Sequence, residues 1–268
     1  TDTFTVVLDA QPTSDVVIAL TSSDTGEATV NSPLTFTAAN WDTPQTVTVT
    51  GADDGSVVDG NQTSSITISI DDANSNDSFD AVTDQTVSVT TTDDDVAGFT
   101  ISETNGSTEV DESGTTDTFT VVLDAQPTSD VLLSLSINDT SEASVSSSLT
   151  FTPINWDSPQ TVTVTGLDEE TVDGTQTSTI TISVVDAVSN DSFDNVTDQT
   201  VSVDTTDDDV AGFTVVEIGG STEVDESGTT DTFTVVLDAQ PTSDVVIALT
   251  SSDTGEATVN SPLTFTAA

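Results

Sequence analysis

The chain repeats itself at intervals of about 115 residues, and this repeat constrains its fold more than any other feature. The first 39 residues, Thr1 to Ala39, recur without a change at Thr230 to Ala268. A diverged copy begins between them at Thr116 and differs from the first at 12 of the 39 positions. Solenoid repeats are roughly 20 to 50 residues long, whereas a period of this size fits one small domain per repeat. We therefore expect a tandem array of domains in alternating order, of which this chain is an internal window.

Apolar residues alternate with Ser and Thr in short segments, and no stretch shows a sustained helical period. In the middle repeat, for example, Phe119, Val121 and Leu123 alternate with Thr and Val. This alternation predicts half-buried strands, which have one face on a core and the other in water. The pattern covers 98–102, 118–123, 131–137, 149–151, 162–164, 180–184 and 201–203, with Pro, Asp, Asn and Gly between them. We therefore predict an all-β chain of tandem seven-stranded antiparallel β-sandwiches with immunoglobulin-like architecture.

The run Thr-Thr-Asp-Asp-Asp-Val, at 91–96 and again at 205–210, marks the clearest boundary between repeats. On this basis residues 96–209 form one complete sandwich. Residues 1–95 form a repeat that lacks its first strand, and residues 210–268 form one that lacks its last strands. No window of the sequence resembles a signal peptide or a transmembrane span, so we expect no membrane insertion in this window.

The chain contains 48 Asp and Glu residues but no Lys, Arg, His, Cys, Met or Tyr, which gives a formal net charge of −48. Nucleic acid is a very poor partner for such a chain because phosphate recognition needs Lys or Arg, and the same argument applies to anionic membranes. The composition also removes disulfides, thiolate zinc sites, histidine ligands and Schiff-base chemistry. A hydrolase could still use a carboxylate pair, but no other feature supports one, so we expect no enzymatic activity.

Three acidic motifs recur in register and supply the candidate functional residues. The motif Val-Asp-Glu-Ser-Gly contributes Glu112 and Glu226. The loop after each Thr-Val-Thr-Val-Thr-Gly segment contributes Asp53, Asp54, Asp59, Asp168, Glu169 and Asp173. The boundary triplets contribute Asp93, Asp94, Asp95, Asp207, Asp208 and Asp209.

These carboxylates would repel one another if they converged. Two carboxylates about 5 Å apart repel by about 3 kcal/mol at an effective dielectric constant of about 20, and the chain has no cationic side chain to offset this. Ca²⁺ is the cation we expect there, since it takes roughly six to eight oxygen ligands in flexible geometry. The alternative is that the acidic groups are scattered on solvated loops, where they keep the surface soluble.

Trp41 and Trp156 each lie in an Asn-Trp-Asp-x-Pro-Gln segment before a predicted strand. We interpret them as packing anchors rather than as platforms that stack on sugars, because Trp buries a large apolar area. The segment 72–77 begins like an EF-hand loop but lacks the glycine and the glutamate that the loop requires. We predict a turn there.

The order of these motifs resembles that of the Calx-β domain family. The similar features are Glu-Ser-Gly, the Phe-Thr-Val-Val-Leu strand, the Thr-Val-Thr-Val-Thr strand with its acidic loop and the terminal Asp-Asp-Asp, which together cover the whole repeat. The resemblance implies a seven-stranded sandwich with a calcium cluster at one end, near the domain junction. It implies ligand roles for Glu112, Asp168, Glu169, Asp173, Asp207, Asp208 and Asp209.

Two departures from the family's pattern imply fewer or more weakly bound calcium ions. The family's mid-domain Asp-Tyr has no match, and Asp173-Gly-Thr-Gln stands where the family usually carries two glutamates. The chain also resembles the tandem repeats of giant secreted bacterial or archaeal surface proteins and adhesins.

These features predict an extracellular structural repeat at the cell surface, in which calcium at each junction stiffens a shaft or surface filament. Its partners would be neighbouring repeats of the same kind. The alternative is a binding module for polysaccharide or ice that uses the flat Thr-rich β-faces, since a Thr-x-Thr pattern recurs in the predicted strands. Any solvated β-face also shows this alternation, so the pattern alone leaves both functions open.

Overall fold

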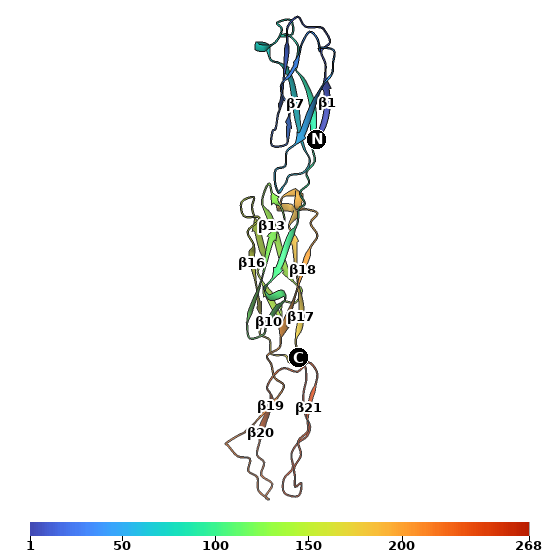
Figure 1. Cartoon of the computed structure of the whole chain (residues 1–268). Helices are drawn as coiled ribbons and strands as arrows, with labels where there is room; N and C mark the ends of the chain where they lie inside the picture. Colours follow the sequence, from blue (N-terminus) through green and yellow to red (C-terminus); the bar gives the residue numbers. More distant parts are fainter. Residues whose placement is uncertain (268) are drawn as a thin grey trace.

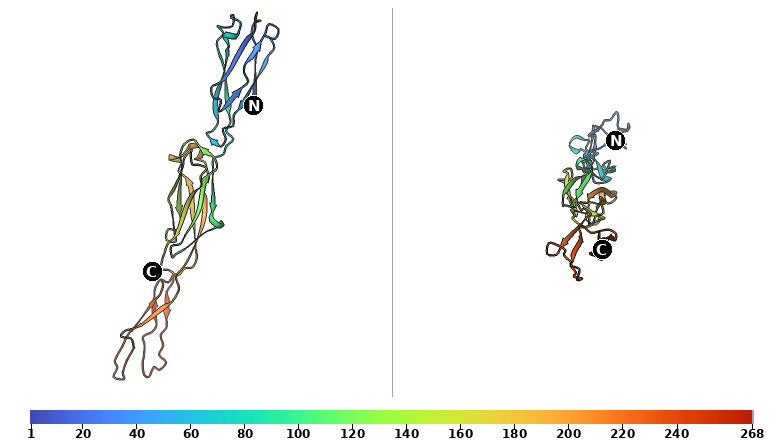
Figure 2. Two further views of the ribbon diagram at one scale, coloured as in Figure 1. Left: turned by 60° about the vertical axis from the view of Figure 1, so that its left-hand side comes forward. Right: turned by 90° about the horizontal axis from the view of Figure 1, so that it is seen from below.

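The computed structural model describes residues 1–267 and shows three units placed end to end in a rod (Figure 1). The views in Figure 2 show the same linear order. We call residues 1–95, 96–209 and 210–267 the first, second and third unit. Regular structure in the described residues consists of β-strands and short 3-10 turns, which confirms the all-β prediction. None of the helices in residues 1–267 is long and apolar enough to cross a membrane.

The second unit is a sandwich of two sheets. Its strands are β9 (Phe99–Glu103), β10 (Thr108–Asp111), β11 (Thr116–Leu123), β13 (Val131–Ile137), β14 (Ala143–Val145), β15 (Ser148–Phe151), β16 (Gln160–Gly166), β17 (Gln176–Val184) and β18 (Gln199–Thr206). One sheet has the order β10-β18-β17-β13-β15 and the other has the order β14-β16-β11-β9. A further short strand, β12 (Gln126–Pro127), pairs with β6 (Val57–Val58) of the first unit.

All seven segments predicted as strands in this unit are strands, and β10, β12 and β14 are additional. All three are short: β10 contains Val110 as its single apolar residue, β12 has two residues and β14 has three. The pairing also differs from a purely antiparallel sandwich, because β10 runs parallel to β18. This parallel pair matters for function because both strands end at the same pole of the unit.

The core follows directly from the alternation. Phe119, Val121 and Leu123 of β11 are buried, and they face Ile180 and Ile182 of the opposite sheet within one continuous cluster. Burying each such side chain stabilises the fold by about 1.5–3 kcal/mol. The two tryptophans, Trp41 and Trp156, are partly buried against the cores of their units, which supports their interpretation as packing anchors.

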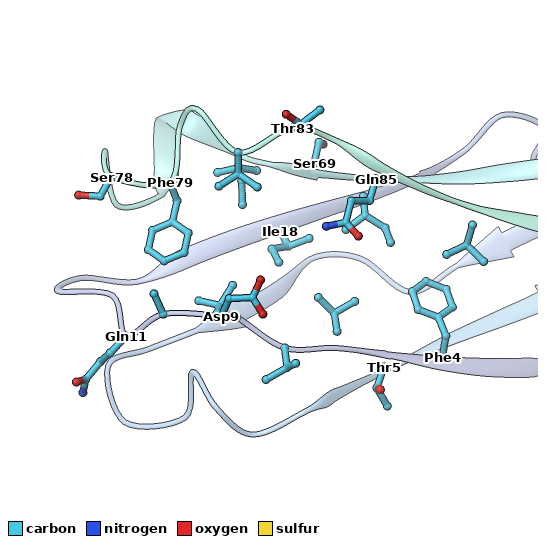
Figure 3. A pocket seen from close by; sticks show the side chains of 18 residues that line it. Phe4, Thr5, Asp9, Gln11, Ile18, Ser69, Ser78, Phe79, Thr83 and Gln85 are labelled. Atoms are coloured by element: carbon cyan, nitrogen blue, oxygen red, sulfur yellow. The ribbon is translucent and has the colours of Figure 1, made fainter.

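The first unit has the same two layers but contains no counterpart of β9 and β10. Its strands are β1 (Asp2–Val6), β2 (Val16–Ser22), β3 (Ala28–Val30), β4 (Leu34–Phe36), β5 (Gln45–Gly51), β7 (Gln62–Ile70) and β8 (Gln85–Thr91). They form sheets of order β1-β5-β3 and β4-β2-β7-β8. An open groove of about 730 Å³ lies along β1, with Phe4, Ile18 and Phe79 in its walls (Figure 3). In the second unit β9 pairs with β11 at the corresponding place.

The third unit, as far as residue 267, consists of two hairpins. One pairs β19 (Phe213–Glu217) with β20 (Phe233–Leu237), and the other pairs β21 (Val245–Ile247) with β22 (Leu263–Phe265). Their apolar side chains remain partly or largely exposed, as Phe213 and Val246 illustrate. The counterparts of β16, β17 and β18, which would cover these side chains, are not among the described residues.

Gly166 allows β16 to pass close to the end of β10. A Cβ atom at this position would lie 2.0 Å from the carbonyl oxygen of Asp111, whereas at Gly51, the equivalent in the first unit, the nearest atom is 3.6 Å away. We expect Gly166→Ala to destabilise the second unit by about 1–3 kcal/mol through overpacking. The matched Gly51→Ala should change the first unit by no more than about 0.5 kcal/mol. Urea unfolding followed by hydrogen exchange in each unit tests this, and equal effects of the two variants would contradict it.

Candidate cation site

Acidic residues from four segments meet at one pole of the second unit. The chain leaves this pole after β18 and continues into the third unit (Figure 1). The parallel pairing of β10 with β18 places Asp111 opposite Thr206, so the residues after both strands emerge together. The backbone N–H of Glu112 donates to the carbonyl oxygen of Thr206 at 3.1 Å, which fixes Glu112 at this point. On the other sheet, the N–H of Leu167 donates to the carbonyl oxygen of Glu142 at 2.9 Å and holds that turn against the acidic loop.

The carboxylates form two overlapping groups that share Glu112. One group is Glu112, Glu142 and Glu169, and the other is Glu112, Asp207 and Asp209. Within each group, one carboxylate oxygen per residue lies within 4.8 Å of the others. Five acidic side chains from both sheets therefore converge at one pole.

Burial makes this convergence costly. Glu112 has no exposed surface and Glu142 is 5% exposed. Both carboxylate oxygens of Glu112 are buried without a hydrogen-bond partner, as are Oε2 of Glu142, Oε1 of Glu169 and Oδ2 of Asp209. Buried charges are normally paired or bound to a metal, and no cationic side chain exists in this sequence. The arrangement thus leaves a concentrated set of unused oxygen ligands.

The pKa values of Glu112 and Asp207 are shifted in opposite directions. Burial, followed by repulsion from the carboxylates of Asp207 and Glu142, raises the pKa of Glu112 to about 7. Burial also raises the pKa of Glu142 and of Asp209. In contrast, the backbone N–H groups of Gly174 and Asp209 donate to Asp207 and lower its pKa.

Asp207 therefore organises the loops around the site as well as belonging to it. Its Oδ2 accepts the N–H groups of Asp173 at 3.0 Å and Gly174 at 2.7 Å, and its Oδ1 accepts the N–H of Asp209 at 2.8 Å. In the first unit, Asp93 makes the same three bonds to Asp59, Gly60 and Asp95. The recurrence shows that the first aspartate of each boundary triplet joins the last strand to the acidic loop.

Of the seven residues predicted as ligands in the second unit, the structure brings four together: Glu112, Glu169, Asp207 and Asp209. Asp168, Asp173 and Asp208 are exposed and lie outside both groups. Glu142 belongs to the site but was not predicted. The signal that could have found it is an acidic residue at the same place in all three copies, because Glu27 and Glu256 are its counterparts in the first and third units.

The first unit has a smaller version of the site, formed by Glu27, Asp54 and Asp59. Three other predicted ligands, Asp53, Asp93 and Asp94, lie outside this group, as does Asp95, whose pKa is raised by burial and by the carboxylate of Asp93. The described part of this unit contains no counterpart of Glu112. In the third unit Glu226 is exposed, and the strands that would enclose it are not among the described residues.

The ligand atoms available at these sites are all carboxylate oxygens, the type that Ca²⁺ and Mg²⁺ prefer. Ca²⁺ suits the second unit better, because its coordination number and geometry tolerate ligands supplied by four separate segments. The unpartnered oxygens of Glu112 fit such an ion. Zn²⁺ and copper sites usually include His or Cys, which this sequence lacks.

Comparison with known proteins gives structural neighbours only. No known protein-family profile matches the chain, and no curated protein matches its sequence. Domains 4 and 5 of the S-layer protein SbsC are 18% identical with a TM-score of 0.33, covering 70% of each chain.

Two Calx structures are also similar. The apo-form Calx CBD1 domain is 15% identical with a TM-score of 0.31, covering 41% of this chain and 98% of its own. The calcium-binding domain CBD12 of CALX1.1 is 17% identical with a TM-score of 0.26, covering 67% and 73%. The chain spans 59% of another match, the chaperone DraB of E. coli. All these TM-scores lie below 0.5, so the likeness assigns no family to the chain.

The raised pKa of Glu112 predicts an unusual dependence of stability on pH. Because the folded state binds a proton more tightly than the unfolded chain, the free energy of unfolding contributed by Glu112 should fall as pH rises from about 4.5 to about 7. Glu112→Gln removes this titration and should raise the melting temperature of the second unit at pH 7 in a chelator. Thermal unfolding across this pH range tests the prediction. A variant that retains the pH dependence of the parent would contradict it.

Proposed function

We propose that this chain is part of an extracellular, non-enzymatic structural protein whose units bind Ca²⁺ at their acidic poles. The observation that carries the proposal is Glu112, a buried carboxylate with two unpartnered oxygens among four other acidic side chains. Protonation of Glu112 alone would still leave four carboxylates together. A divalent cation offsets several of them at once and uses the oxygens that lack hydrogen-bond donors.

The position of the site supports a role at the junction between units. Asp207 and Asp209 belong to the segment that leads from β18 into the third unit, and Glu169 belongs to a loop that contacts that unit. A cation bound there would connect the end of β10, the acidic loop and the inter-unit segment. Restricting these three segments relative to one another would stiffen the rod.

The overall form and charge also fit a shaft or filament at a cell surface. The units lie end to end (Figure 1), and each carries a large negative charge that pushes its neighbours apart. Cations in the surrounding medium screen this repulsion and fill the acidic poles. We propose an external location because calcium is abundant outside cells, and we propose neighbouring repeats as the principal partners. A giant adhesin is one protein of this kind.

Calcium should stabilise the chain more than ionic strength does. At a free concentration a hundred times the dissociation constant, binding stabilises the folded state by about 2.7 kcal/mol. We expect Glu142→Gln to lose most of this stabilisation, because Glu142 supplies a buried oxygen to the site. Glu109→Gln, on an exposed residue of β10, is the matched control and should retain it. Calorimetry in EDTA and in calcium at matched ionic strength measures the difference.

An unchanged melting temperature of the parent chain in calcium would remove the calcium proposal. Equal losses in Glu142→Gln and Glu109→Gln would instead show that the ion binds the acidic surface in general. Small-angle scattering of the same samples tests the stiffening. We expect a longer maximum dimension in calcium than in EDTA, with little change in circular dichroism.

We propose surface binding through a Thr-rich face as the second candidate function. On the outer face of the four-stranded sheet, three cross-strand pairs of threonines lie in register: Thr116 with Thr165, Thr118 with Thr163 and Thr120 with Thr161. Such pairs repeat at roughly 4.8 Å between strands and 6.7 Å along them, which gives an ordered array of hydroxyl and methyl groups. An array of this kind suits an ordered surface, such as ice or a crystalline polysaccharide.

If this face binds ice, the chain should show thermal hysteresis that Thr118→Tyr and Thr163→Tyr abolish. Both residues lie in the middle of the array, where a bulky ring prevents flat contact. Thr200→Tyr, on an exposed position of β18 in the other sheet, is the control. If the face binds a crystalline polysaccharide instead, the same variants should lose retention on the insoluble polysaccharide. Binding that is equal in all variants would contradict a role for this face.

A further inference from the structure

A short parallel β-bridge connects the first unit to the second. The loop between β5 and β7 contains β6, in which Val57 and Val58 pair with Gln126 and Pro127 of β12. The backbone N–H of Gln126 donates to the carbonyl oxygen of Ser56 at 2.6 Å. The same loop begins with Asp53 and Asp54 and ends with Asp59, so one loop contributes to the acidic pole and also contacts the next unit.

Val58 lies in the core of the unit that follows its own. It is 6% exposed, and it belongs to the buried cluster of the second unit, together with Ala125 and Val131. The core cluster of the first unit does not contain it. Val58 is therefore a side chain that one unit supplies to the hydrophobic core of another.

The backbone part of this contact recurs at the second junction. The N–H of Gln240 donates to the carbonyl oxygen of Glu170 at 2.6 Å, and the N–H of Val172 donates to the carbonyl oxygen of Gln240 at 3.1 Å. Thr171 and Gln240 form a parallel bridge, as Val57 and Gln126 do. The receiving segment Ala-Gln-Pro-Thr-Ser-Asp is the same in all three units, at 10–15, 125–130 and 239–244.

We propose that the loop 55–58 is a docking element that completes the core of the following unit. In this arrangement the stability of a unit depends on the unit before it, and the dependence runs in one direction along the chain. The partner that fits the receiving segment is the acidic loop of another repeat. The extended backbone of this loop forms the β-bridge, and one of its valines enters the core. The first unit presents the same segment at Ala10 to Asp15, which offers a place for the loop of a further repeat.

This proposal does not require a cation, so its failure and the failure of calcium binding are distinguishable. The test uses the whole 268-residue chain in EDTA, with hydrogen exchange measured by mass spectrometry after pepsin digestion. We expect Val58→Ala to speed exchange in the core strands β13 and β17 of the second unit at least tenfold. The strands β2 and β7 of the first unit, which contains the mutation, should exchange at the parent rate.

Val57→Thr is the matched control, because the second unit carries Thr171 at this position. It keeps the backbone bridge and leaves Val58 in place, so it should not change exchange in either unit. Exchange in the second unit that stays within twofold of the parent in Val58→Ala would overturn the proposal. Faster exchange confined to the first unit would overturn it too, because Val58 would then act within its own unit.

Discussion

Every charged side chain in this protein is negative, so no carboxylate can be neutralised by an ion pair between side chains. This constraint decides how the acidic groups are placed. Most lie on exposed loops, where water solvates them, and some accept hydrogen bonds from backbone N–H groups instead. Asp93 and Asp207 each accept three such bonds and thereby fix the loops at the pole. Glu112 is different, since it is buried beside other carboxylates and accepts none.

Much of the fold could be predicted from the sequence because the cores depend on local alternation. Phe119 and its neighbours on β11 alternate strictly, and the copies keep this pattern while exchanging apolar residues of similar size, such as Ile18 and Leu133. Exchanges that conserve volume cost little in a packed core. The short strands were not predictable in this way, because β10 has one apolar residue and depends on β18, about a hundred residues later, for its pairing.

The candidate site could be predicted only in part. Glu112, Glu169, Asp207 and Asp209 belong to motifs that attract notice because they repeat as acidic runs, but Glu142 is a single acidic residue before a three-residue strand. Its proximity to Glu112 depends on how the two sheets face each other, which no local pattern encodes. The role of Val58 was not predictable for a related reason. A single valine in an acidic loop gives no sign of burial, and the core in which Val58 is buried belongs to the following repeat.

The acidic loop of each unit contributes a carboxylate to the acidic pole and then a carbonyl oxygen to the bridge with the next unit. The number of residues between these two positions differs between the first and second units. In the first unit it passes from Asp54 to Ser56 through Gly55, whereas in the second Glu170 directly follows Glu169. Despite this difference of one residue, the carbonyl oxygens of Ser56 and Glu170 each accept a bond of 2.6 Å from the next unit. The difference in loop length therefore lies before the residues that bond to the next unit and does not change those bonds. Successive repeats can diverge in their acidic chemistry while the backbone contact with the next unit stays the same.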